Sequence, residues 1–337
     1  MTILITDNVH PIMREILERE GHSVHIDTDV TYDSLLERVN DYDAIVVRSK
    51  INIDRDFLSH ARHLKCIGRV GAGMETIDVD YAESLGIRCL NSPEGNRDAV
   101  GEHALGLLLA LFDKIAAADM EVRKGLWRRE ANRGLEVKGK KIGIIGFGNM
   151  GGAFAKRLAG FECEVLVYDI LGEKASGFGL HLPYVRNVAL ETLQQEADVV
   201  SLHVPLTDTT HYLANESFFE SFAKPLYLIN TSRGAVVHTA QLVAEMEQGK
   251  VLGAALDVLE YENMSKDGLD LENIPADFRY LLQSPRTVLS PHVAGWTVES
   301  KYKLAAVLAD KMIAVLNGAK SNFTSIFGVE CPKLRQN

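Results

Sequence analysis

The part of the chain that most restricts its fold runs from residue 141 to residue 152. The apolar run 141–145 (KIGII) predicts a buried strand, and it passes directly into 146–151 (GFGNMG), after which a helical pattern begins near Gly152. A GxGxxG sequence between a strand and a helix permits a tight turn, lets backbone approach a pyrophosphate, and lets the helix pack closely on the strand. The N–H groups at the start of that helix would then face the phosphates. The residues expected to bind a dinucleotide here are Gly146, Gly148, Asn149, Met150 and Gly151.

A carboxylate stands where such a domain holds the adenosine ribose. Asp169 ends the next apolar strand (EVLVYD), 18 residues after Gly151. A carboxylate at this point can accept hydrogen bonds from both ribose hydroxyls and would repel a 2′-phosphate, so it favours NAD over NADP. No arginine follows directly, although Lys174 is close enough in sequence to pair with a 2′-phosphate and so to weaken the preference for NAD. The alternative is a glycine-rich turn with a capping aspartate that binds no nucleotide.

Strand-like and helical segments alternate through most of the chain, and this rhythm predicts parallel sheets. One series fills the first hundred residues and ends at a turn-rich joint, 91–97 (NSPEGNR). A long helix is expected at about 99–124, a second series of strands and helices at 141–291, an irregular polar segment at 262–286, and a last helix at about 299–316. A chain of 337 residues exceeds the size at which single cores stop growing. The expected fold class is therefore α/β, with two doubly wound parallel-sheet domains.

Three polar residues follow strands of the second series and suit acid–base chemistry. They are Arg233 in NTSRG, Glu262 in ALDVLEYE and His292 in SPHVAGW. The carboxyl ends of the strands in an open α/β sheet face the ligand crevice. There a histidine can exchange protons near neutral pH, a carboxylate beside it can orient and stabilise the protonated ring, and an arginine can clamp a carboxylate and polarise a carbonyl. Each residue also has a structural alternative when it is considered alone. Arg233 could form a salt bridge at a helix end, Glu262 could be a solvated charge in a loop, and His292 could be a hydrogen-bonded turn residue.

These segments together resemble the D-isomer-specific 2-hydroxyacid dehydrogenase family over nearly the whole chain. The motifs that carry the resemblance are GFGNMG with Asp169, NTSRGAVV, AALDVLEYE and SPHVAGWT. The resemblance implies NAD-dependent hydride transfer in which Arg233, Glu262 and His292 are catalytic, and it implies a homodimer. One departure is Asn263, because the family often has proline after the catalytic glutamate. No metal is expected, and the further cofactor contacts that we expect are Val204, Pro205, Thr231 and Asp257.

The resemblance also implies a split domain organisation. A flavodoxin-like substrate domain would use both ends of the chain, and a Rossmann NAD-binding domain would be inserted between two long helices. The expected boundaries place residues 1–98 and 293–337 in the substrate domain and residues 99–292 in the NAD-binding domain.

Two arginines and one loop are expected to bind the substrate. Residues 70–73 (VGAG) resemble the family loop that holds the substrate carboxylate through backbone N–H groups, an anion nest made by Gly71, Ala72 and Gly73. Arg48 in VVRS and Arg69 in GRVGAG resemble segments of D-3-phosphoglycerate dehydrogenases, and extra arginines suit a substrate that carries a phosphate as well as a carboxylate. The alternative is that both arginines pair with carboxylates of their own domain. The expected substrate is 3-phosphoglycerate, with glycerate/hydroxypyruvate and other 2-hydroxy acids as alternatives.

Other features of the sequence narrow its partners and location. The net charge of −10 argues against nucleic acid as the main partner. The most apolar stretch, 104–112, is too short to span a bilayer, and the amino terminus is typical of a first strand and not of a signal peptide. The cysteines are far apart, without a CxxC pair, which fits free thiols in a reducing compartment and favours the cytoplasm. They are Cys66, Cys89, Cys163 and Cys331.

Three further expectations concern related proteins. Formate dehydrogenase is disfavoured, because that branch usually replaces the glutamate that matches Glu262. The regulatory domain that many phosphoglycerate dehydrogenases carry at the carboxyl terminus is not expected, since the chain ends soon after its last helix. A second class of function stays open: an NAD-sensing, corepressor-like interaction protein would share both the fold and the motifs.

Overall fold

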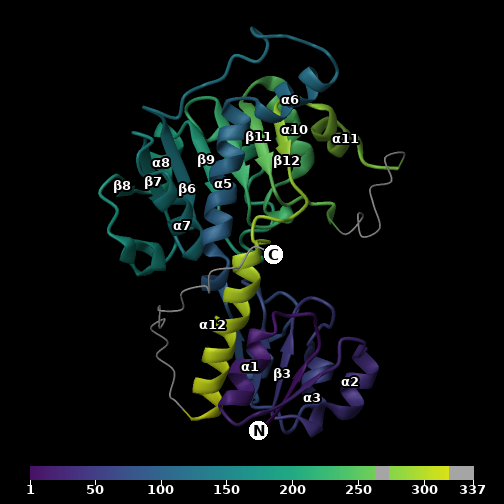
Figure 1. The fold of residues 1–337 in the computed structure, drawn as a ribbon. Helices are drawn as coiled ribbons and strands as arrows, with labels where there is room; N and C mark the ends of the chain where they lie inside the picture. Colours follow the sequence, from purple (N-terminus) through teal and green to yellow (C-terminus); the bar gives the residue numbers. More distant parts are fainter. Residues whose placement is uncertain (263–272, 319–337) are drawn as a thin grey trace. The chain divides into compact units, whose positions relative to one another are not determined.

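The alternation of apolar strands and helices produces two separate parallel sheets. The computed structural model describes residues 1–262 and 273–318, apart from the side chain of Phe178. It divides the chain into two compact units: a terminal unit, which contains Met1–Asn96 and the chain from Trp296 onward, and a central unit, Arg97–Gly295. The boundaries expected from sequence follow residues 98 and 292. Figure 1 shows both units, and each is described here by itself.

The terminal unit contains a five-stranded parallel sheet in the order β2-β1-β3-β4-β5. This is the flavodoxin-like order, in which the sheet grows in both directions from its first strand. Helices α1 and α12 pack on one face and α2, α3 and α4 on the other (Figure 1). Alternate residues of β1 point to opposite faces, so Ile3 and Ile5 join one core while Leu4 joins the other. The strands are β1 Thr2–Ile5, β2 Ser23–Ile26, β3 Ala44–Val47, β4 Cys66–Arg69 and β5 Arg88–Asn91; the helices are α1 Ile12–Arg19, α2 Tyr32–Arg38, α3 Arg55–His60, α4 Val79–Ser84 and α12 Val298–Leu316.

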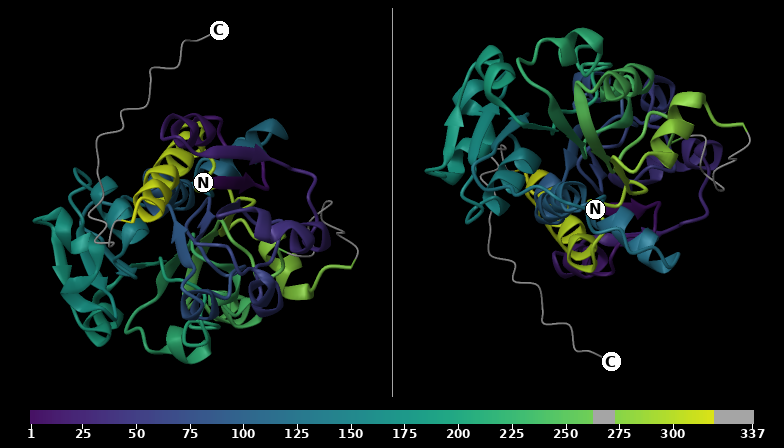
Figure 2. Two further views of the ribbon diagram at one scale, coloured as in Figure 1. Left: turned by 90° about the horizontal axis from the view of Figure 1, so that it is seen from below. Right: turned by 90° about the horizontal axis from the view of Figure 1, so that it is seen from above.

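The central unit contains a seven-stranded parallel sheet in the order β12-β11-β10-β9-β6-β7-β8. The strand order reverses between β6 and β9, which is where a doubly wound sheet opens its ligand crevice. Helices pack on both faces of this sheet (Figure 2): α5 and α7 on one, and α8 to α11 on the other. The strands are β6 Lys141–Ile145, β7 Glu164–Tyr168, β8 Val185–Asn187, β9 Val199–Leu202, β10 Leu226–Asn230, β11 Val251–Leu256 and β12 Thr287–Leu289; the helices are α5 Arg97–Phe112, α6 Ile115–Arg123, α7 Asn149–Arg157, α8 Leu190–Glu196, α9 Glu216–Glu220, α10 Thr239–Gln248 and α11 Ala276–Gln283.

The fold class expected from sequence is confirmed, but three elements differ from the expectation. The helix expected at 99–124 is two helices, because Lys114 adopts a left-handed conformation (φ 53°) between α5 and α6. The short strand β8 was not expected, and α11 occupies part of the segment expected to be irregular. Residues 263–272, including the unusual Asn263, lie outside the described residues.

Two expectations about the whole chain can be compared with the described residues. Within 1–262 and 273–318, no helix combines the length and the apolar character needed to cross a membrane. Cys66, Cys89 and Cys163 are free thiols, and Cys331 lies outside the described part of the chain.

Candidate active site

The glycine-rich loop joins β6 to α7 by a turn that excludes side chains at two positions. Gly146 has φ +89°, and a Cβ atom there would lie 2.5 Å from the carbonyl oxygen of His203. A Cβ atom on Gly151 would collide with the carbonyl oxygen of Gly146. Gly148 is the N-cap of α7, whose first turn has no side-chain cap among the described residues. The backbone N–H groups of Asn149 and Met150 therefore stand at an uncapped helix start, which is a favourable place for a pyrophosphate.

Asp169 lies at the end of β7 and holds the glycine-rich loop. One oxygen of its carboxylate accepts the backbone N–H of Phe147 at 2.7 Å, and the other accepts that of Leu171 at 2.8 Å. The side chain is only partly buried, so its oxygens have capacity for further donors. The next residue, Ile170, is 84% exposed. An exposed aliphatic side chain beside a carboxylate that is predicted to bind the ribose is suited to cover one face of an adenine ring, and this residue was not predicted from the sequence.

The other predicted cofactor residues lie across the switch point, after β9 and β10. A Cβ atom on Gly146 would come within 3.1 Å of Val204, so Val204 lies directly against the glycine turn. Pro205 follows it, and its carbonyl accepts the hydroxyl of Thr210 at 2.6 Å. Thr231 is buried, with its hydroxyl 3.4 Å from the ring of His203. Burial lowers the pKa of His203 to about 3, so this ring stays neutral and contributes no charge to the crevice.

His292 and Glu262 form an ion pair at the carboxyl edge of the same sheet. Nδ1 of His292 lies 2.8 Å from Oε2 of Glu262, and the second glutamate oxygen accepts the backbone N–H of Leu259. The pKa of His292 is raised, chiefly by the hydrogen bond to Glu262; burial and the charge of Arg233 act in the opposite direction. The two residues follow the neighbouring strands β12 and β11, which explains why they meet.

Arg233 joins this pair through the loop that follows β10. Its Nη1 donates to the carbonyl of Ser232 at 2.6 Å, and the side chain of Asn230 holds the loop by donating to the carbonyl of Arg233 at 2.9 Å. A Cβ atom on Gly234 would collide with the carbonyl oxygen of Leu259, so the Arg233 loop lies directly against the loop that carries Glu262. The structure thus brings the three predicted catalytic residues together on loops after adjacent strands.

Asp257 has no exposed side-chain surface, and its oxygens accept several donors. Oδ1 accepts the hydroxyl of Ser290 at 2.6 Å and the backbone N–H of Val293 at 2.9 Å, while Oδ2 accepts the backbone N–H of Ala294 at 2.9 Å. Burial acts to raise the pKa of Asp257, but its hydrogen-bonding partners, His103 first among them, hold this pKa below its ordinary value. Its predicted contact with the cofactor stays a prediction.

The predicted substrate residues cluster at the carboxyl edge of the terminal sheet. Arg48 follows β3, and its guanidinium carbon lies 4.8 Å from the ring centroid of Trp296. Arg69 ends β4, its Nε donates to the carbonyl of Arg48 at 3.2 Å, and a Cβ atom on Gly71 (φ +151°) would collide with its guanidinium group. The loop that contains Ala72 and Gly73 is tied to β5, because the side chain of Asn91 donates to the carbonyl of Ala72 at 2.6 Å. Two cationic groups and the Gly71–Gly73 loop thus share one edge of this unit.

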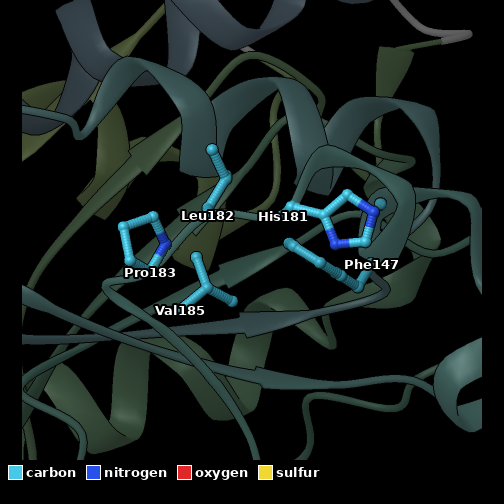
Figure 3. Close-up of a pocket in the computed structure, with 6 residues that line it drawn as sticks. Phe147, His181, Leu182, Pro183 and Val185 are labelled. Carbon is cyan, nitrogen blue, oxygen red and sulfur yellow. The ribbon is translucent and has the colours of Figure 1, made fainter.

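A separate pocket lies beside the glycine-rich loop (Figure 3). It contains none of the three predicted catalytic residues, and most of its surface is apolar. We therefore assign no catalytic role to this pocket. The lining residues are Phe147, Gly177, His181, Leu182, Pro183 and Val185.

Comparisons with known proteins identify relatives of similar sequence. The chain is 34% identical over 322 residues to D-3-phosphoglycerate dehydrogenase of Archaeoglobus fulgidus, covering 94% of this chain and 58% of that protein. It therefore spans little more than half the length of that relative. It is 38% identical over 290 residues to glyoxylate reductase of Thermofilum pendens, covering 85% of this chain and 82% of that protein.

Solved structures and a family description agree with these relatives. The crystal structure of D-lactate dehydrogenase with NAD+ from Lactobacillus jensenii superposes with a TM-score of 0.77 at 26% identity, covering 96% of this chain and 99% of that one. Residues 105–294 match the family described as D-isomer specific 2-hydroxyacid dehydrogenase, NAD binding domain. This match covers more than half of the 337 residues and includes the glycine-rich loop and the Arg233, Glu262 and His292 loops. The chain belongs to the family of D-isomer-specific 2-hydroxyacid dehydrogenases.

Proposed function

We propose that this chain is an NAD-dependent oxidoreductase that transfers hydride between the nicotinamide and a small D-2-hydroxy acid or its 2-keto partner. The observation that carries the proposal is the His292–Glu262 ion pair, 2.8 Å long, which stands with Arg233 on the sheet edge that also bears the glycine-rich loop. A general acid, its carboxylate partner and a cationic clamp are the groups that reduction of a 2-keto acid requires of a protein.

The chain's own residues supply the proton and hold the substrate. NADH, when bound, supplies the hydride that is added to C2 of the keto acid. Because Nδ1 of His292 is bonded to Glu262, its Nε2 is the atom that can pass a proton to the carbonyl oxygen. Arg233 can bind the substrate carboxylate with two N–H groups and polarise the carbonyl. Hydride plus proton converts the keto acid to the hydroxy acid, and the reverse reaction uses neutral His292 as the base.

The residues around the glycine-rich loop fit NAD. The uncapped start of α7 suits the pyrophosphate, and partly exposed Asp169 suits the ribose hydroxyls. We assign the predicted contacts at Val204, Pro205 and Thr231 to the opposite wall of this crevice, since Val204 lies against Gly146.

Replacing Asp169 with alanine should reduce the preference for NADH over NADPH at least tenfold, about 1.4 kcal/mol. The change removes both the acceptor of the ribose hydroxyls and the charge that repels a 2′-phosphate. The measurement is the ratio of the two kcat/KM values. Glu173→Ala is the matched control, because it removes an exposed carboxylate four residues away. An unchanged ratio in the Asp169 variant would show that another residue sets the choice.

We assign substrate anchoring to the terminal unit and propose 3-phosphoglycerate/3-phosphohydroxypyruvate as the substrate pair. Support comes from Arg69, whose guanidinium group lies against Gly71, and from Arg48, whose guanidinium group stacks on Trp296 at the same edge of the terminal sheet. A phosphate and a carboxylate on one substrate need more than one cationic or N–H site. Glycerate/hydroxypyruvate and other 2-hydroxy acids are the alternatives, and the glyoxylate reductase relative shows that the family contains enzymes named for an unphosphorylated keto acid.

A panel of keto acids tests this choice. We expect kcat/KM for 3-phosphohydroxypyruvate to exceed the values for hydroxypyruvate, pyruvate and glyoxylate by 100-fold or more, about 2.7 kcal/mol. Arg48→Gln should reduce this preference. Arg55→Gln is the matched control, because Arg55 also stacks on an aromatic ring, Tyr81, at 4.5 Å. A higher value for an unphosphorylated acid would reject the substrate proposal while leaving the reaction class intact.

We also propose that the chain forms a homodimer through α6 and the segment after it. None of the nine residues of α6 is buried, and Ile115, Met120 and Val122 are each more than half exposed. Trp127, just beyond the helix, is 80% exposed. A short helix gains little stability without packing, and a large exposed apolar patch marks an interaction surface. A second copy of the chain would cover it, and a light-scattering mass equal to one chain would contradict the proposal.

A cytoplasmic location stays a prediction.

A further inference from the structure

A partly buried hydrogen-bond network joins α5 to the loop that carries His292. His103 on α5 has its Nε2 2.9 Å from the hydroxyl of Ser290 and 3.4 Å from Oδ1 of Asp257. Ser290 lies two residues before His292 and 2.6 Å from the same carboxylate oxygen. All members belong to the central unit, and none is one of the predicted acid–base residues.

The donors and acceptors of this network are fixed by elementary chemistry. A serine hydroxyl has one hydrogen, and the short contact with the Asp257 carboxylate uses it, since a carboxylate can only accept. The hydroxyl oxygen is therefore the acceptor in its contact with His103, and Nε2 of His103 carries the hydrogen. The chain of bonds runs in one direction, from His103 through Ser290 to Asp257.

Asp257 in turn holds the backbone at His292 and at the two residues after it. Its carbonyl accepts the N–H of His292 at 2.7 Å, and its two carboxylate oxygens accept the N–H groups of Val293 and Ala294, each at 2.9 Å. His292 has φ +54°, a left-handed conformation that residues with a Cβ atom rarely adopt. Such a conformation persists where surrounding bonds over-determine it, and the bonds from Asp257 do this directly.

We propose that His103, Ser290 and Asp257 are positioning residues that hold His292 left-handed, so that its ring meets Glu262. Released from the left-handed conformation, the backbone of His292 would point its ring in another direction, away from the 2.8 Å contact. The expected fall in kcat rests on the proposed function. The expected change in the orientation of the His292 ring rests on the geometry alone. Sequence analysis quoted Ser290 within SPHVAGW but gave no reason to choose His103, which lies 187 residues away along the chain.

The test uses two pairs of variants of the full chain. Ser290→Ala removes the hydroxyl, and Ser290→Thr keeps it. His103→Leu removes the donor, and His103→Gln keeps an N–H at a similar reach. Ser284→Ala is the control, because it removes a serine hydroxyl before the same strand, β12. Three quantities are measured: kcat for keto-acid reduction, the Kd for NADH, and the proton resonance of His292 Nδ1–H in protein labelled with ¹⁵N-histidine.

We expect Ser290→Ala and His103→Leu to lower kcat about tenfold or more, because small displacements of a catalytic group are costly. The Kd for NADH should stay within about threefold, since neither residue is placed against the cofactor. The downfield resonance of a Nδ1–H held by a carboxylate, assigned by its loss in His292→Ala, should weaken in both variants. Ser290→Thr and His103→Gln should retain most of the kcat and most of the His292 resonance, and Ser284→Ala should change neither quantity.

Two results would overturn the inference. One is a wild-type kcat with an unchanged His292 resonance in Ser290→Ala; the other is equal loss in both members of a pair. Should Ser290→Ala fail to fold, the His103 pair decides, because that side chain is 28% exposed and tolerates exchange more readily. Should the wild-type chain reduce no 2-keto acid, the proposed function fails, while the resonance still decides whether the network positions His292.

Discussion

Replacing His292 with alanine should reduce kcat for 2-keto acid reduction about a thousandfold, with little change in the Kd for NADH. The imidazole is the group that we expect to donate the proton to the forming alkoxide, and positioned acid catalysis contributes roughly 10²–10⁴-fold. The ring of His292 contacts Glu262, which lies outside the glycine-rich loop. Loss of the ring therefore removes chemistry while leaving cofactor binding in place.

Stopped-flow or steady-state NADH oxidation gives kcat, and quenching of protein fluorescence gives the Kd for NADH. His60→Ala is a suitable control, because that histidine is exposed on α3 in the terminal unit. Turnover within tenfold of the wild type in His292→Ala would remove this residue from its proposed role. A large rise in the Kd for NADH would instead assign it to cofactor binding.

Replacing Glu262 with glutamine should move the pH profile of reduction to lower pH. The hydrogen bond and charge of Glu262 raise the pKa of His292, so the protonated acid persists to higher pH than in a free histidine. Glutamine keeps one acceptor oxygen, which can still accept from the Nδ1–H, but it loses the second oxygen that accepts the N–H of Leu259, and it carries no charge. The pKa of His292 should therefore fall, with Arg233 and burial now acting unopposed by that charge.

The sign of the effect differs between the two directions of the reaction. Reduction needs protonated His292, so its rate above the lowered pKa should drop, by about tenfold near neutral pH. Oxidation needs the neutral ring, so its rate should be retained at a lower pH than in the wild type. The measurement is kcat/KM against pH in both directions. A profile that keeps its wild-type midpoint in Glu262→Gln would show that another group controls the titration.

The parts of the site that arise from local pattern could be predicted from the sequence. The glycine-rich loop is such a case, because the restrictions at Gly146 and Gly151 act over a few residues. The grouping of Arg233, Glu262 and His292 was also predictable, since carboxyl ends of parallel strands share one edge. The break between α5 and α6 could not be predicted, because the residue with the left-handed conformation is Lys114 and not a glycine or a proline, which usually mark such a break.

Contacts between distant segments could not be predicted in the same way. The 2.8 Å ion pair depends on the left-handed backbone of His292, and that conformation depends on the side chain of Asp257. Asp257 was predicted to meet the cofactor, because its position directly after the strand β11 indicated the crevice but not the donors around it. His103 is a partly buried residue of α5, and only tertiary packing brings it to Ser290. Such networks depend on register between elements that no short pattern encodes.

The most direct test of the central claim follows the hydrogen itself. The wild-type chain is mixed with NADH that carries deuterium at both hydrogen positions of C4 of the nicotinamide and with each keto acid of the panel, and the product is analysed by NMR and by chiral chromatography. We predict a 2-hydroxy acid of D configuration that carries deuterium at C2 for at least one keto acid. Absence of deuterium at C2 of every product would contradict hydride transfer by this chain, and an L configuration of the deuterated product would contradict its assignment to D-2-hydroxy acids.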